Sequence, residues 1–355
     1  MNCGHIYNRL FDPNKYDSIY TSGPTTNMVV SPRMSTYLEA TAKYIFQYTK
    51  TPSPIVLDIG GGTGALARIL AKSSKKVYLV DPSTKENLHE NIPQNLTVHK
   101  KFFPCIEIQD KKFDLIVLRQ VVEHILDVTK LFLALRTHLG DNGIVYLEIP
   151  NMNYIAKYGS IVDFHYPHIH YFSSSVIERV ILNIGFQIID FEEIKDGHDL
   201  RFMLQKASIP LEPQSLTQTP EVARSCRLKK EFTAKRLSGE DTLDSLANRT
   251  IALYGATANC QAFVGLYEPK LQNVVCVIDD TPSYNEMEVW ISGIPIPIRT
   301  ISDESIENVD TIIITAYLHD STIYAKLRRS GFLGNIFTLR SNNEKSNDLI
   351  SLFDN

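Results

Sequence analysis

Short apolar runs and amphipathic segments alternate along two blocks of this 355-residue chain. In the first block, runs of four to six residues are rich in Val, Ile and Leu, as is typical of strands buried on both faces of a parallel sheet. These runs lie at 56–59, 76–80, 113–118 and 144–149. Helical spacing predicts helices at 35–48 and 173–184. With strand-like segments at 185–194 and 200–205, the pattern predicts a doubly wound α/β domain over residues 35–206.

The second block repeats this architecture on a smaller scale, without a sequence repeat. A proline-rich polar stretch and a charged helical segment fill residues 207–249, which we interpret as a linker and helix. Apolar runs near 251–254, 273–278, 311–316 and 335–339 then predict a smaller Rossmann-like domain over residues 250–340. Residues 1–34 are expected to be an irregular segment, and residues 341–355 a polar tail that frays.

The turn after the first apolar run carries the strongest chemical signal. Val56 to Leu70 reads as a buried strand, a glycine turn and the start of a helix, with Asp58 at the strand end. Glycines at Gly60, Gly62 and Gly64 let the backbone turn sharply and approach a ligand closely, and the helix start offers free N–H groups. Asp81 ends the next strand, where an acid commonly accepts hydrogen bonds from ribose hydroxyls.

Two adenosyl cofactors fit such a turn. The spacing of Gly60, Gly62 and Ala65 matches the dinucleotide fingerprint of NAD enzymes, a weak signal by itself. Asp58 would repel a pyrophosphate, whereas it would pair with the α-ammonium of S-adenosylmethionine. The sequence therefore favours S-adenosylmethionine, and NAD stays open as the alternative.

The same motifs resemble those of the class I methyltransferases. Val56–Gly64 resembles their first motif, Phe113–Ile125 their fourth strand and the segment after it, and Leu139–Pro150 their fifth strand. This resemblance implies a methyltransferase domain that binds S-adenosylmethionine. In that family the position of His124 faces the sulfonium end of the cofactor. Arg119 and Gln120 are candidates for lining its methionine part, a role that the sequence alone does not decide.

A closer resemblance, over nearly the whole chain, is to sugar C-methyltransferases that act on nucleotide-linked keto-sugars. Cys3–Pro13 with Tyr20–Gly23 resembles their start, and Ile251–Ala256, Val277–Pro282 and Gly293–Ile296 resemble their C-terminal domain. The resemblance implies that residues 1–34 are the remnant of a substrate lid and that residues 250–340 bind substrate. By the same resemblance, His168 is the base that deprotonates the carbon next to the ketone, and Tyr20 polarises the sugar oxygen. His124 matches the family's histidine after the fourth strand, which orients the substrate or acts as an acid–base group.

The chain departs from that family at three places. The family begins with a zinc module of four cysteines, of which only Cys3 remains, so we expect no such zinc. Pro167 stands where the family commonly has Glu before its catalytic His. Asn259 and Cys260 occupy the region where the family often has a second glycine.

The loop at 163–173 is rich in histidine, the side chain best suited to proton removal near neutral pH. His165, His168 and His170 have spacing that zinc would accept, but we favour acid–base use and expect no metal. For any single histidine, packing of the loop is as good an explanation as catalysis.

The net charge indicates which kinds of partner the protein binds, and the cysteines indicate the cellular compartment in which it works. A net charge of −4 gives no electrostatic footprint for nucleic acid, and five scattered cysteines without a C-x-x-C pair suit a reducing, cytoplasmic setting. No signal pattern or membrane-length apolar run is seen. We expect a small-molecule acceptor, and the oligomeric state is not determined by sequence. Besides C-methylation of a sugar, the alternatives are O- or N-methylation of another metabolite, an NAD-dependent oxidoreductase, and a binding protein that has lost turnover.

Overall fold

The computed structural model describes most of the chain and divides it into two compact units. The described residues are 4–22, 32–84, 92–109, 111–158, 160–207, 220–281, 284–285, 287–301, 306–340 and 349–353. The first unit comprises Met1–Asn153 with Tyr166–Val222, and the second comprises Tyr154–His165 with Ala223–Asn355. The placement of Tyr154–His165 in the second unit is a division that the sequence pattern did not reveal.

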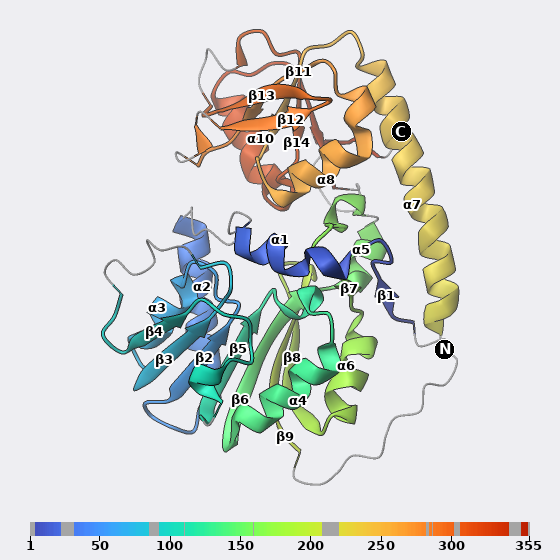
Figure 1. The fold of residues 1–355 in the computed structure, drawn as a ribbon. Coiled ribbons are helices and arrows are strands. Elements are labelled where there is room, and N and C mark those ends of the chain that lie inside the picture. Colours follow the sequence, from blue (N-terminus) through green and yellow to red (C-terminus); the bar gives the residue numbers. More distant parts are fainter. Residues whose placement is uncertain are drawn as a thin grey trace. The chain divides into compact units, whose positions relative to one another are not determined.

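A seven-stranded sheet forms the centre of the first unit (Figure 1). Its order is β4 (Leu96–His99), β3 (Lys76–Val80), β2 (Ile55–Ile59), β5 (Phe113–Arg119), β6 (Leu139–Pro150), β9 (Asp199–Lys206) and β8 (Phe186–Ile194). The first five strands are parallel, and β9 runs antiparallel to both of its neighbours. The chain order reverses at β2, so the carboxyl ends of β2 and β5 border the crevice where doubly wound sheets bind ligands.

Helices cover both faces of this sheet because consecutive strand residues point to opposite sides. Val56 packs in one core with α2 (Pro32–Phe46) and α3 (Ala65–Ala71), whereas Leu57 packs in the other with α4 (Val128–His138) and α6 (Ser174–Asn183). The predicted helices at 35–48 and 173–184 are confirmed as α2 and α6.

The N-terminal segment contains more regular structure than its composition indicated. It forms β1 (Ile6–Tyr7), the 3-10 turn η1 (Pro13–Lys15) and α1 (Tyr16–Ser22). β1 pairs antiparallel with β7 (His170–Tyr171), which joins this segment to the histidine-rich loop. Short 3-10 turns lie at η3 (Ile106–Ile108) and η4 (Val122–His124), and residues 1–3 lie outside the described part.

The second unit contains another seven-stranded sheet. Its order is β12 (Glu288–Ile291), β13 (Ile294–Arg299), β11 (Val274–Ile278), β10 (Ile251–Tyr254), β14 (Thr311–Ile314), β15 (Asn335–Thr338) and β16 (Ile350–Ser351). Only β12 is antiparallel to its neighbour. The accompanying helices and turns are α5 (Met152–Tyr158, which spans the unit boundary), η5 (Ile161–Asp163), α7 (Pro220–Ser245), α8 (Ala258–Tyr267), η6 (Glu268–Lys270), η8 (Tyr317–His319) and α10 (Asp320–Arg329).

Two doubly wound α/β sheets were predicted, and this fold class is confirmed. Residues 341–355 were predicted to be a fraying polar tail, but the end of this segment is part of the second unit. β16 pairs with β15, and Leu352 is buried in the hydrophobic core of that unit. Apolar burial of Leu352 and Phe353 outweighs the polar composition of the preceding residues. In the described part of the chain, no helix has the length and apolar character needed to cross a membrane.

Candidate active site

The glycine turn after β2 is shaped around the carboxylate of Asp58. Gly60, Gly62 and Gly64 have positive φ angles of 69°, 55° and 69°, a region that favours glycine. A Cβ atom built on Gly61 would lie 2.4 Å from Asp58 Oδ2, so only glycine leaves room for that carboxylate. The turn and Asp58 therefore form one structural feature, as the sequence spacing predicted.

Asp58 lines a small cavity, and one of its two carboxylate oxygens lacks a hydrogen-bond partner among the described residues. Its side chain is 2% exposed, and Oδ2 accepts no hydrogen bond from the described residues. The cavity is lined by Leu38, Asp58, Gly60, Gly61, Thr63, Ala65, Leu66 and Arg119. Burial raises the pKa of Asp58 to about 7, the positive charge of Arg119 opposes that rise, and Asp81 adds to it. A cationic ligand group in the cavity would supply the missing partner.

Asp81 supports the glycine turn from the end of β3. Its Oδ2 accepts a hydrogen bond from the Gly62 N–H at 2.8 Å, and its Oδ1 accepts from the Ser83 N–H and Oγ, both at 2.6 Å. A carboxylate has about four lone-pair sites, so these bonds leave capacity for a ligand hydroxyl. Asp81 therefore stabilises the glycine turn, in addition to the ribose contact that the sequence predicts for it.

Arg119 is the last residue of β5, and Gln120 follows it. Gln120 has a φ of 56°, its N–H donates to the Glu148 carbonyl at 2.8 Å, and its Nε2 donates to Asp199 Oδ2 at 2.9 Å. The side-chain amide of Gln120 is therefore engaged within the protein. Arg119, in contrast, lines the same cavity as Asp58.

A buried charge network behind these residues was not foreseen from sequence. Lys195 Nζ donates to Glu148 Oε1 at 2.9 Å and to Asp199 Oδ2 at 2.5 Å, and Tyr146 donates to Glu148 Oε2 at 2.7 Å. Glu148 and Asp199 are fully buried, and the nearby Lys195 charge holds the pKa of Asp199 at about 2 despite its burial. The acids come from strands that are distant in sequence, which is why no local motif announced them.

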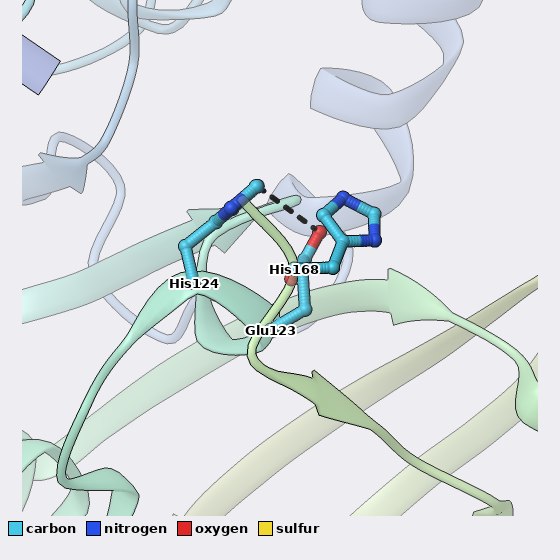
Figure 2. A group of neighbouring side chains, drawn as sticks. All are labelled: Glu123, His124 and His168. Atoms are coloured by element: carbon cyan, nitrogen blue, oxygen red, sulfur yellow. Dashed lines mark ion pairs between the residues drawn. The ribbon is translucent and has the colours of Figure 1, made fainter. Parts of the chain in front are cut away.

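A second group of polar side chains gathers at η4, after β5. Glu123 and His124 come from η4 and His168 from the loop before β7, and the Ile169 N–H fixes that loop by donating to the Glu123 carbonyl at 2.8 Å. Figure 2 shows the Glu123 carboxylate between the two imidazoles. His124 Nε2 lies 3.9 Å from Glu123 Oε1, and the two imidazole centroids are 4.7 Å apart. The predicted pair His124 and His168 is thus brought together, with Glu123 added.

Glu123 is the unusual member of this group. It is 1% exposed, and neither carboxylate oxygen accepts a hydrogen bond from the described residues. Burial raises the pKa of Glu123 to about 8. Its own backbone N–H and the charge of Arg119 oppose this rise, and the charges of Asp199 and Glu148 add to it. Glu123 is not among the site residues predicted from the sequence.

Tyr20 reaches the same place from α1. Its hydroxyl donates to the Pro167 carbonyl at 3.4 Å, and its ring meets that of His124 edge-on at 5.8 Å. Burial raises the pKa of Tyr20 further above its usual value, so the phenol stays protonated at neutral pH as a hydrogen-bond donor.

The other two loop histidines do not join this group. His170 Nε2 lies 2.9 Å from the Ile125 carbonyl and its Nδ1 lies 2.9 Å from His5 Nε2, so both ring nitrogens are used in holding β1 and β7. Burial lowers the pKa of His170 and lowers that of His5 to about 4. His165 belongs to the segment that packs in the second unit.

In the second unit, an acid supports the turn after β10, as Asp81 supports the turn after β2. A buried carboxylate of the protein, Asp163, also lies at the start of the helix that follows the turn. Asp279 accepts from the Ala256 N–H at 2.7 Å, as Asp81 does from Gly62. At the start of α8, Asn259 donates to Asp163 Oδ1 at 3.3 Å, and Tyr317 donates to Asp163 Oδ2 at 2.5 Å. A phosphate at this helix start would have to compete with the buried acid Asp163.

Comparison with known proteins gives a family match over most of the first unit and the Tyr154–His165 segment. Residues 30–190 match the family model described as a methyltransferase domain. This segment resembles a methyltransferase domain. A curated relative, the ubiquinone biosynthesis O-methyltransferase of Bradyrhizobium diazoefficiens, is 30% identical over 116 residues, covering 31% of this chain and 46% of that enzyme. The chain therefore spans less than half the length of the curated relative it matches.

Solved structures of low similarity include two methyltransferases. An S-adenosylmethionine-dependent methyltransferase from Clostridium acetobutylicum is 16% identical, with 55% of this chain and 99% of that chain covered and a TM-score of 0.39. A ribosomal protein L11 methylase from Lactobacillus delbrueckii subsp. bulgaricus is 22% identical, with 49% and 79% covered and a TM-score of 0.35. Scores this low say nothing about the substrate of this chain.

Proposed function

We propose that the protein is an S-adenosylmethionine-dependent methyltransferase that acts on a small molecule. The observation that carries this proposal is Asp58, a buried acid that lines the cavity at the glycine turn and whose Oδ2 accepts no hydrogen bond from the described residues. The α-ammonium of S-adenosylmethionine carries the positive charge and the N–H donors that would pair with this acid. The family match over residues 30–190 supports the same activity.

The same acid argues against the dinucleotide alternative. A pyrophosphate at this turn would bring negative charge next to a carboxyl group that burial already makes difficult to ionise. S-adenosylmethionine carries no phosphate, so its binding brings no such repulsion. The residues that we assign to the cofactor are Asp58, Gly60, Gly62, Gly64, Asp81 and Gln120, together with Arg119, which lines the same cavity as Asp58.

We assign the acceptor chemistry to the cluster at η4. In C-methylation, His168 takes a proton from the carbon next to a ketone, the resulting enolate carbon forms a bond to the cofactor methyl, and the S–CH₃ bond breaks to leave S-adenosylhomocysteine. The sulfonium makes the methyl group electrophilic, so the protein's part is positioning and the transfer of one proton. His124 lies beside His168, and Tyr20 is a protonated donor suited to polarise the ketone oxygen.

The acceptor we propose is a keto-sugar, most simply one linked to a nucleotide, with the second unit taking part in its recognition. The resemblance of the chain to sugar C-methyltransferases supports this choice. The Asp163 carboxylate at the start of α8 makes that helix end unsuitable for a diphosphate, so the nucleotide part would bind elsewhere.

A second candidate is O-methylation of another small metabolite. The 30% identity over 116 residues with a ubiquinone biosynthesis O-methyltransferase favours it. There the same histidine would remove a hydroxyl proton, and the oxygen would take the methyl group.

Two measurements test these proposals. Calorimetry should show binding of S-adenosylmethionine and none of NAD; the reverse would overturn the assignment of the cofactor. Candidate keto-sugars in D₂O should then exchange the proton next to the ketone in the presence of enzyme and S-adenosylhomocysteine. Release of S-adenosylhomocysteine from a turnover mixture without such exchange would favour O-methylation, and saturable cofactor binding with no turnover on any acceptor would favour a binding protein.

A further inference from the structure

The side chains of Glu123, His124 and His168 have the composition and spacing of a metal-ligand set. Each offers one ligand atom, and the three atoms lie within 4.8 Å of one another. Ligands of a tetrahedral zinc ion are about 3.4 Å apart, since each bond is roughly 2.0–2.1 Å long. Small side-chain rotations would close the remaining gap. The set differs from the three loop histidines that the sequence suggested, because only His168 is common to both.

The tautomer of His124 suits metal binding. Its Nδ1 lies 3.0 Å from the Pro167 carbonyl, and a carbonyl oxygen can only accept, so Nδ1 carries the hydrogen. The lone pair of the neutral ring is therefore on Nε2, the nitrogen that lies 3.9 Å from Glu123 Oε1. A backbone carbonyl that holds the other ring nitrogen is the usual support of a metal-binding histidine.

Glu123 is the observation that calls for a cation. Its carboxylate is buried, and both oxygens lack hydrogen-bond donors among the described residues. Ionisation of a buried acid in this condition is costly, and a metal ion bound to the carboxylate would offset that cost. Figure 2 shows this carboxylate facing the space between the imidazoles of His124 and His168.

We propose that Glu123, His124 and His168 bind a divalent ion of the Zn²⁺ class. Two imidazoles and one carboxylate favour zinc over Mg²⁺ or Ca²⁺, which prefer oxygen ligands, and three protein ligands leave a position for water. The ion takes the lone pair with which His168 would remove a proton. It therefore inhibits methyl transfer. This inhibition rests on the proposed function, whereas metal binding does not.

The test uses the full chain after chelation and dialysis. Calorimetry with Zn²⁺ and absorption spectra with Co²⁺ should both show one ion per chain, and Mg²⁺ should give no signal. Glu123→Gln keeps the shape of the side chain and should weaken Co²⁺ binding by about tenfold or more, and His168→Ala should weaken it further. Glu107→Gln is the matched control, since Glu107 is partly exposed and pairs with Lys101.

Several results would overturn the proposal. The metal site would be refuted if Co²⁺ did not bind, or if wild type and Glu123→Gln bound it equally. A thiolate charge-transfer band would also refute it, because none of the three proposed ligands is a cysteine. Zn²⁺ that raises methyl transfer would overturn the inhibitory role and the base assignment of His168. A chain that binds Zn²⁺ here but not S-adenosylmethionine would keep the metal site and refute the proposed function.

Discussion

Replacement of Asp58 by Asn tests the proposed charge pairing between Asp58 and the α-ammonium of S-adenosylmethionine. Asn keeps the size and shape of the side chain but cannot become negative. A charge-assisted hydrogen bond contributes about 1.5–3 kcal/mol, so the loss of charge should weaken binding of S-adenosylmethionine by about 10- to 100-fold at pH 7.5. Calorimetry measures this directly, and Asp141→Asn, at a fully exposed position, should leave the affinity unchanged.

The pH dependence of binding gives a sharper test than the affinity alone. With a pKa of about 7, roughly one Asp58 in eleven is ionised at pH 6 and about half at pH 7. The cofactor ammonium pairs with the ionised form, so wild-type affinity should rise about fivefold over that interval. The rise should stop near pH 8, where an α-amino group begins to lose its own proton. Asp58→Asn should lack the rise.

The raised pKa of Asp58 also determines whether the free energy of unfolding rises or falls with pH. Because the folded pKa of Asp58 lies above the unfolded value of 3.8, the folded state binds the extra proton, and the free energy of unfolding falls as pH rises between about 4 and 7. Above pH 7 the full penalty is present, on the order of a few kcal/mol. Without cofactor, Asp58→Asn should therefore be more stable than wild type at pH 8 and similar to it at pH 4. A variant that matches wild type in affinity, pH profile and melting temperature would refute this reasoning.

Three further substitutions test separate parts of the structure. His168→Ala should keep cofactor affinity nearly intact in calorimetry and lower kcat by about a hundredfold or more, the usual scale of general base catalysis. Asp81→Ala should weaken cofactor binding and also lower the melting temperature, because it removes the acceptor of the Gly62 N–H. Tyr317→Phe should destabilise the second unit by about 1–3 kcal/mol in urea titration, since the buried Asp163 loses a donor. Its matched control is Tyr324→Phe.

Each of these has a distinct contrary result. Full turnover in His168→Ala would remove that residue from the mechanism. Unchanged cofactor affinity in Asp81→Ala would refute its ribose role even if the melting temperature fell. Equal urea midpoints for wild type and Tyr317→Phe would show that the Asp163 contact contributes nothing to stability.

The sequence by itself determined the two sheets and the first turn. Buried parallel strands need continuous apolar runs, and a tight turn beside a buried carboxylate needs glycine, so both leave marks within a few neighbouring residues. Val56 and Leu57 already indicated a strand covered on both faces. Asp58 and Gly61 lie three residues apart, and their contact is local.

Only the tertiary structure decided which distant side chains meet. Glu123 and His168 are brought together by the pairing of the loop with η4. Lys195, in the turn between β8 and β9, reaches Glu148 because β9 lies next to β6 in the sheet. These contacts depend on loop closure and strand order, which no short stretch of sequence records. For the same reason the burial of Glu123, which makes its carboxylate exceptional, could not be inferred from its position in the chain.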